Sequence, residues 1–80
     1  MKQKKIQKTQ LTMAIELLGS GESVSTLEFR ERGIMNPARV IERLKQRGAV
    51  VTTRRENQTD SMGRVHSRVA VYRLEGWTND

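Results

Sequence analysis

The spacing of apolar residues changes from a helical period to a strand period at Ala49, and this change limits the folds open to the chain. In the first half, apolar positions between Leu11 and Leu18 recur at i, i+3, i+4 and i+7, which is one face of a helix. After Ala49, residues 49–57 and 65–74 are rich in β-branched side chains and read as two strands. We therefore expect an α+β fold with its helices first and its strands last.

Length and composition exclude several classes of protein. The 80 residues allow one domain with a thin core, because a chain of this size buries only about 60% of the surface that its unfolded form exposes. The absence of cysteine excludes disulfides, Cys-ligated metals and thiol nucleophiles, and it fits a cytoplasmic protein. The longest apolar-rich run, Met13 to Leu18, contains Glu16 and is far shorter than the roughly 20 residues that span a bilayer, so we expect no membrane segment.

The charge of the chain is positive and unevenly distributed. The formal net charge is +6, and the basic residues concentrate in residues 1–8 and 36–73, whereas residues 9–35 and 74–80 are mildly acidic. Such a balance favours a polyanionic partner, with nucleic acid first and an anionic membrane surface second. A solvated basic surface without a partner is the alternative.

Local signals predict two helices in the first third of the chain. Thr9 offers an N-cap for the first helix, which Gly19 ends. The stretch Ser25-Thr26-Leu27-Glu28 matches a capping box, so we expect a second helix over residues 26–32. Val24, just before it, can add a short strand to the edge of a sheet.

Asn36-Pro37 is the strongest local signal in the chain. Asn is a favoured N-cap, and Pro suits the first helical position because its φ is already helical and no N–H is needed there. We therefore expect a third helix over residues 37–47, closed by Gly48. The turn Gly33-Ile34-Met35 joins it to the second helix, and we expect the apolar side chains of this turn to wedge between helices.

The two strands, residues 49–57 and 65–74, are joined by a polar loop over 58–64 and predict an antiparallel hairpin. An isolated hairpin is only marginally stable, so this one must pack on the helices. Tyr72 and Leu74 are the expected core residues of the second strand, and Trp77 is expected to pack back onto the domain.

This order of elements resembles winged helix-turn-helix DNA-binding domains, and in particular small helix-turn-helix proteins of bacteria, phages and mobile elements. The resemblance covers roughly residues 9–74, with residues 1–8 as a flexible basic arm and 75–80 as a C-terminal tail. The resemblance is based on the segments Ser25–Phe29, Gly33–Met35, Asn36–Leu44, Arg47–Val51 and Gly63-Arg64. It implies three helices plus a C-terminal hairpin, the wing, with the third helix in the major groove and the wing on the backbone or in the minor groove.

The third helix carries side chains able to read DNA. A helical wheel turns Val40, Ile41 and Leu44 inward and leaves a polar face outward. Arg bonds bidentately to guanine, Gln to adenine, and Glu accepts from cytosine, while cations at the flanks suit phosphates. The predicted DNA contacts of this helix are Asn36, Ala38, Arg39, Glu42, Arg43, Lys45 and Gln46. A solvated, charged helix face is the alternative.

The wing and the arm supply further cations. The predicted wing contacts are Arg54, Arg55, Arg64 and Arg68, with Arg64 suited to a narrow minor groove. Charge that protects an edge strand from aggregation is the alternative for them. The predicted arm contacts are Lys4, Lys5 and Lys8, for which a solubilising tail is an equal alternative.

Catalysis is not expected, because the chain lacks paired carboxylates, a Ser/His/Asp set and a phosphate-cradling loop. His66 has no partner at metal-ligand spacing, so we expect no metal, no cofactor and no small-molecule ligand.

The sequence thus predicts sequence-specific binding of double-stranded DNA by a small transcriptional regulator or a phage or mobile-element accessory factor. The alternatives are a protein–protein interaction module on the same scaffold and RNA binding, which the scarcity of aromatic residues disfavours. A homodimer on DNA stays open.

Overall fold

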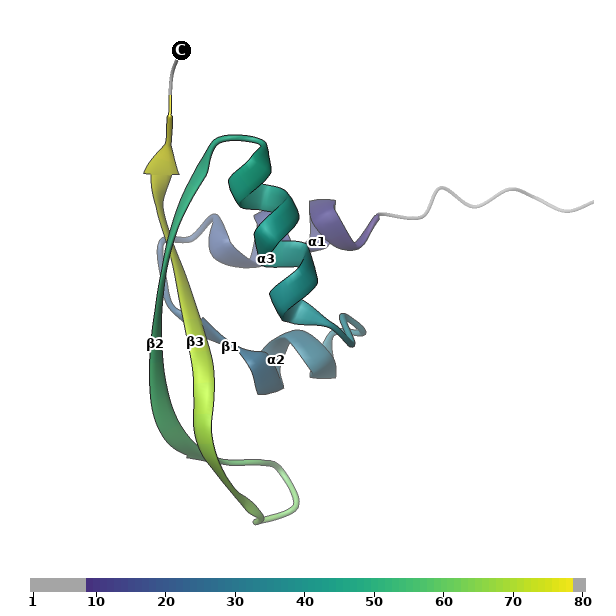
Figure 1. The fold of residues 1–80 in the computed structure, drawn as a ribbon. Helices are drawn as coiled ribbons and strands as arrows, with labels where there is room; N and C mark the ends of the chain where they lie inside the picture. Colours follow the sequence, from purple (N-terminus) through teal and green to yellow (C-terminus); the bar gives the residue numbers. More distant parts are fainter. Residues whose placement is uncertain (1–8, 79–80) are drawn as a thin grey trace, which may run out of the picture.

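The computed structural model describes residues 9–78 and contains the expected helices and hairpin (Figure 1). In chain order the elements are α1 (Gln10–Leu18), β1 (Val24–Ser25), α2 (Thr26–Glu31), α3 (Pro37–Gln46), β2 (Ala49–Thr59) and β3 (Val65–Trp77). The predicted arm, with Lys4, Lys5 and Lys8, lies outside the described residues. β2 is two residues longer than predicted, and β3 continues into the segment that the sequence assigns to the C-terminal tail.

The first two helices begin at side-chain caps, as predicted. Thr9 Oγ1 accepts from the amide of Thr12 at 3.1 Å. The capping box of α2 is complete, because Ser25 Oγ accepts from Glu28 N at 3.1 Å and Glu28 Oε1 accepts from Ser25 N at 3.0 Å. Each bond satisfies a first-turn amide or the cap amide that would otherwise lack a partner.

The third helix begins at the predicted position, but Asn36 makes no side-chain capping bond. Its backbone, with φ −128° and ψ 74°, departs from the extended conformation of the capping residues Thr9 and Ser25. The fixed φ of Pro37 at the first helical position therefore marks this helix start without help from the Asn36 side chain.

The sheet has the order β1-β3-β2 with antiparallel pairing throughout. The two-residue β1 pairs Val24 with Tyr72, which confirms the short extra strand near Val24. β2 and β3 form the wing, and their register shifts between Val50 and Val51 and again between Glu56 and Gln58. In Figure 1 the helices lie on one side of the sheet and the hairpin continues past α2.

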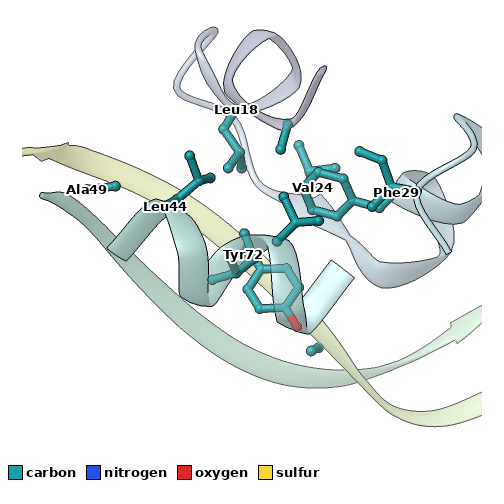
Figure 2. Packing of buried hydrophobic residues seen from close by; sticks show 11 residues of the cluster. Leu18, Val24, Phe29, Leu44, Ala49 and Tyr72 are labelled. Carbon is teal, nitrogen blue, oxygen red and sulfur yellow. The ribbon is translucent and has the colours of Figure 1, made fainter. Parts of the chain in front are cut away.

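The core lies between the helices and one face of the sheet (Figure 2). The rings of Phe29 from α2 and Tyr72 from β3 meet with centroids 6.0 Å apart and planes inclined at 58°. The buried cluster consists of Ala14, Leu18, Val24, Phe29, Ile34, Val40, Ile41, Leu44, Ala49, Ala70 and Tyr72. No helix within residues 9–78 is long and apolar enough to cross a membrane.

Two apolar residues depart from the predicted packing. Ile34 is fully buried at the turn before α3, but its neighbour Met35 is 67% exposed, so only one of the two wedges between helices. Trp77 is 45% exposed because it is the last residue of β3, where it pairs with Ala49 at the end of the sheet instead of folding back over the core.

Candidate nucleic-acid interface

The predicted reading face of α3 lies at the surface. Pro37, Val40, Ile41 and Leu44 are the buried residues of the helix. The residues predicted to contact DNA from this helix are all exposed: Asn36, Ala38, Arg39, Glu42, Arg43, Lys45 and Gln46. Lys45 Nζ and Glu42 Oε2 are 3.9 Å apart, an exposed pair that stabilises little and leaves both groups accessible.

A row of three arginines runs from this face to one of its flanks. Arg39, Arg43 and Arg47 follow one another at intervals of four residues. They line a groove of about 490 Å³ whose other side is the start of α1, including Thr9 and Thr12. Like charges at this spacing repel one another. The sequence-based prediction did not include Arg47 among the DNA contacts. Its position four residues after Arg43, on the same side of the helix, is the sequence signal that could have identified it as part of this row.

The other flank of α3 faces the wing across a second groove, of about 310 Å³. Ala38 and Asn36 line it from α3 and its cap, and the predicted wing residues Arg55 and Arg68 line it from β2 and β3. Arg30 of α2 also lines it. The sequence-based prediction missed Arg30, because this residue lies in the mildly acidic segment, far from the other cations in sequence.

Arg54 and Arg55 lie on opposite faces of the hairpin. Directly opposed residues of an antiparallel pair share a face of the sheet. Arg55 opposes Ala70, a core residue on the helix side, whereas Arg54 opposes Val71 on the other side. The structure therefore brings Arg55 toward α3 and leaves Arg54 on the face turned away from it.

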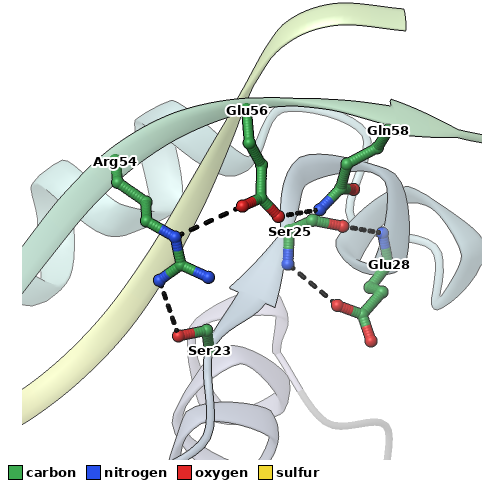
Figure 3. A network of polar contacts seen from close by, with 6 residues as sticks. All are labelled: Ser23, Ser25, Glu28, Arg54, Glu56 and Gln58. Carbon is green, nitrogen blue, oxygen red and sulfur yellow. Dashed lines mark hydrogen bonds and ion pairs between the residues drawn. The ribbon is translucent and has the colours of Figure 1, made fainter. Parts of the chain in front are cut away.

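Arg54 takes part in a polar network on that outer face (Figure 3). Its Nη1 donates to Ser23 Oγ at 3.2 Å, and its Nε lies 3.4 Å from Glu56 Oε1. Gln58 Nε2 donates to Glu56 Oε2 at 2.8 Å, and this bond, with Arg54, holds the pKa of Glu56 below its ordinary value. Val71, which pairs with Arg54 across the strands, is only 3% exposed although it faces away from the helices.

Asp60 organises the tip of the wing. Its Oδ1 accepts from the amides of Met62 and Arg64, each at 2.9 Å, and its Oδ2 lies 2.8 Å from His66 Nε2. The bond to His66, followed by that from the Arg64 amide, lowers the pKa of Asp60. His66 is therefore a partner of the turn and more than a lone surface residue, and the turn holds the exposed Arg64 at the tip beside Gly63, whose φ is +86°.

Among residues 9–78 no group of three or more His, Cys, Asp or Glu side chains is placed to hold a metal ion.

Comparison of the sequence with models of protein families matches residues 9–76 to a model described as a winged helix-turn-helix domain. No curated protein and no solved structure gives a significant match. The matched segment contains α1, α2, α3, β1 and β2 entirely and β3 up to its penultimate residue.

Proposed function

This chain belongs to the winged helix-turn-helix family, which indicates DNA binding in general, and from that premise we propose that it recognises double-stranded DNA with α3 in the major groove. Arg39, Glu42 and Gln46 would contact base edges, because their side chains stand on the exposed face of this helix.

The observation that carries this proposal is the position of the α3 reading face between two cationic flanks. One flank contains Arg43 and Arg47 of α3 and its C-cap, and the other contains Arg55 and Arg68 of the wing. A helix in a major groove lies between two phosphate backbones, so cations on both sides match the shape and charge of a duplex. Such contacts fix the position of the helix, and the base-facing residues then supply the specificity.

The side chains of the α3 face favour DNA over a protein partner. A protein interface would display exposed aliphatic or aromatic residues at its centre. Within residues 9–78, the large exposed hydrophobic residues are Met35, Val50, Met62, Val65 and Trp77, and all of them lie outside α3. The reading face carries only polar, charged and small side chains.

In the cell we propose a role as a small transcriptional regulator or as an accessory factor of a phage or mobile element, without catalytic activity. A single reading helix on a domain of this size binds modestly alone. A homodimer on two half-sites would increase the affinity, and its target would have two-fold symmetry.

The decisive test is fluorescence anisotropy with random-sequence duplex DNA at two or more salt concentrations. If about five phosphates are contacted, log K should fall against log[salt] with a slope of roughly −4.5. Absent binding or salt-independent binding would contradict the proposal. Selection of preferred duplexes from a random pool then tests sequence specificity, and symmetry in the selected sites reports whether two copies bind together.

A further inference from the structure

Three arginines from three different elements meet in the groove between α2, α3 and the wing. Arg30 comes from the last turn of α2, Arg55 from the middle of β2 and Arg68 from β3. The groove has a volume of about 310 Å³, and no Asp or Glu of the described residues lines it. The positive charges gathered there have no neutralising side chain within the groove.

The backbone at Arg68 is strained. Its φ of +54° lies in the left-handed region, and it is the one non-glycine residue of the described chain with a positive φ. The wing is irregular at this point, because the register shifts between Glu56 and Gln58. Bulges of this kind aim side chains at functional sites, and a costly conformation at a residue with a side chain commonly accompanies function.

Two side chains hold the strained residue in place. Asn57 Oδ1 accepts from the amide of Arg68 at 3.1 Å, and Arg55 Nη1 donates to the carbonyl of Arg68 at 3.3 Å. Arg55 therefore supports Arg68 directly as well as contributing its own charge to the groove. Arg55 and Arg68 come from neighbouring strands, and both line the groove together with Arg30 of α2.

An anion is the ligand that such a groove fits. Guanidinium groups bind phosphate oxygens through paired, charge-assisted hydrogen bonds, and they keep their charge at every physiological pH. The start of α3 lines the same groove, with the side chain of Asn36 free of any capping bond. The groove also lies directly beside the reading face of α3, where a duplex backbone passes if the helix occupies the major groove.

We propose that Arg30, Arg55 and Arg68 together bind one phosphate of the DNA backbone, and that the strained conformation of Arg68 is kept for this contact. The inference rests on the proposed function, because it names the anchor that fixes the wing side of the same surface. It adds Arg30, which belongs to neither the reading helix nor the wing, to the residues that contact DNA.

The first test compares Arg30→Ala with Arg32→Ala. Both arginines are exposed and two residues apart, but Arg32 lines a different groove, together with Glu28 and Glu31. Arg30→Ala should weaken binding to every duplex about tenfold, and it should reduce the steepness of the salt slope by less than about 0.9, the value of one phosphate, because Arg55 and Arg68 still contact that phosphate. Arg32→Ala should change neither quantity by a comparable amount. Equal effects of the two variants would overturn the proposal.

A double variant tests whether the arginines share a phosphate. If they do, Arg30→Ala combined with Arg55→Ala should reduce the steepness of the salt slope by no more than about 0.9, because a single phosphate is involved. A reduction of about 1.8 would mean two separate phosphates and would overturn the shared site. Circular dichroism melting of each variant shows that it remains folded, and Arg30→Ala combined with Arg68→Gly replaces the double variant if loss of Arg55 disrupts the wing.

Arg68→Gly separates binding from stability. Glycine adopts a positive φ without strain, so this variant should melt no lower than the wild type while binding DNA about tenfold more weakly. Unchanged affinity would overturn the role of Arg68. If the wild type fails to bind duplex DNA, the proposed function falls and this inference falls with it. If the wild type binds with the expected salt dependence and Arg30→Ala behaves like Arg32→Ala, the inference alone falls.

Discussion

Arg54 and Arg55 are neighbours in β2, yet their side chains lie on opposite faces of the sheet. Arg54 opposes Val71 and bonds to Ser23 on the outer face, whereas Arg55 opposes Ala70 and lines the groove beside α3. Two residues of the same type and charge therefore differ in what they can reach. Only Arg55 lies on the side of the sheet where the reading helix is.

The pair Arg54→Ala and Arg55→Ala should separate stability from DNA binding. Removing Arg54 breaks two exposed contacts on the outer face, so we expect a loss of about 1 kcal/mol or less in urea unfolding, with DNA affinity nearly unchanged. Removing Arg55 should weaken the binding of all duplexes in anisotropy measurements. A loss of DNA affinity confined to Arg54→Ala would show that the duplex lies on the outer face.

Arg39→Ala and Arg64→Ala should affect DNA binding in different ways. Arg39 is exposed on α3, and loss of a bidentate contact to guanine costs about 1–3 kcal/mol at one base position. This variant should change the sequences recovered by selection. Arg64 lies at the wing tip, so its loss should weaken all duplexes alike. The reverse pattern would mean that the wing reads the sequence and that α3 serves as the anchor.

Ser25→Ala and Asn36→Ala test the two helix caps. Ser25 is buried and completes the capping box of α2, so its replacement should lower the free energy of unfolding by about 0.5–2 kcal/mol. Asn36 makes no capping bond, and its replacement should leave the stability nearly unchanged. Thermal unfolding followed by circular dichroism measures both. Equal destabilisation would show that Asn36 caps α3 in solution.

The wing tip should loosen in acid. The pKa of Asp60 is lowered in the folded state by its bonds to His66 and to the Arg64 amide, so these bonds are present at neutral pH and are lost as the pH falls through the lowered pKa. Between about pH 5 and pH 1, the amide NMR signals of Met62 and Arg64 should titrate with a midpoint below that of an unstructured aspartate.

Asp60→Asn is the control for this titration. The variant lacks the ionising group, so the same two amide signals should show no comparable step over this pH range. A midpoint at or above the ordinary value of an aspartate in the wild type would contradict the hydrogen bonding of the turn.

Local sequence signals were sufficient to predict the elements of the fold. The capping box at Ser25 and Glu28 uses contacts three residues apart, and the proline at position 37 sets its own φ, so both helix starts follow from near neighbours. The family match confirms the resulting winged helix-turn-helix prediction. The strand ends were less predictable, because Trp77 joins β3 through its pairing with Ala49.

The candidate site depended on contacts between residues far apart in the chain. Thr53, Arg54 and Arg55 are all polar, so nothing in the alternation of β2 indicates which of them faces the helices. Their orientation follows from the register with Tyr72 and its neighbours. Arg30 joins the groove only through the packing of α2 against the sheet. The contacts predicted for the N-terminal arm remain predictions.

The brevity of β1 divides the hairpin into two parts with different mechanical properties. β1 pairs with β3 only at Val71 and Tyr72, and the Thr26 hydroxyl bonds the Ala70 carbonyl at 3.0 Å. Beyond that bond, the described chain leaves the outer part of the hairpin as a two-stranded ribbon, which twists more readily than a three-stranded sheet. We therefore expect the outer part of the hairpin to bend more easily than the rest of the domain, which would let it follow duplexes of different curvature without repacking the interior.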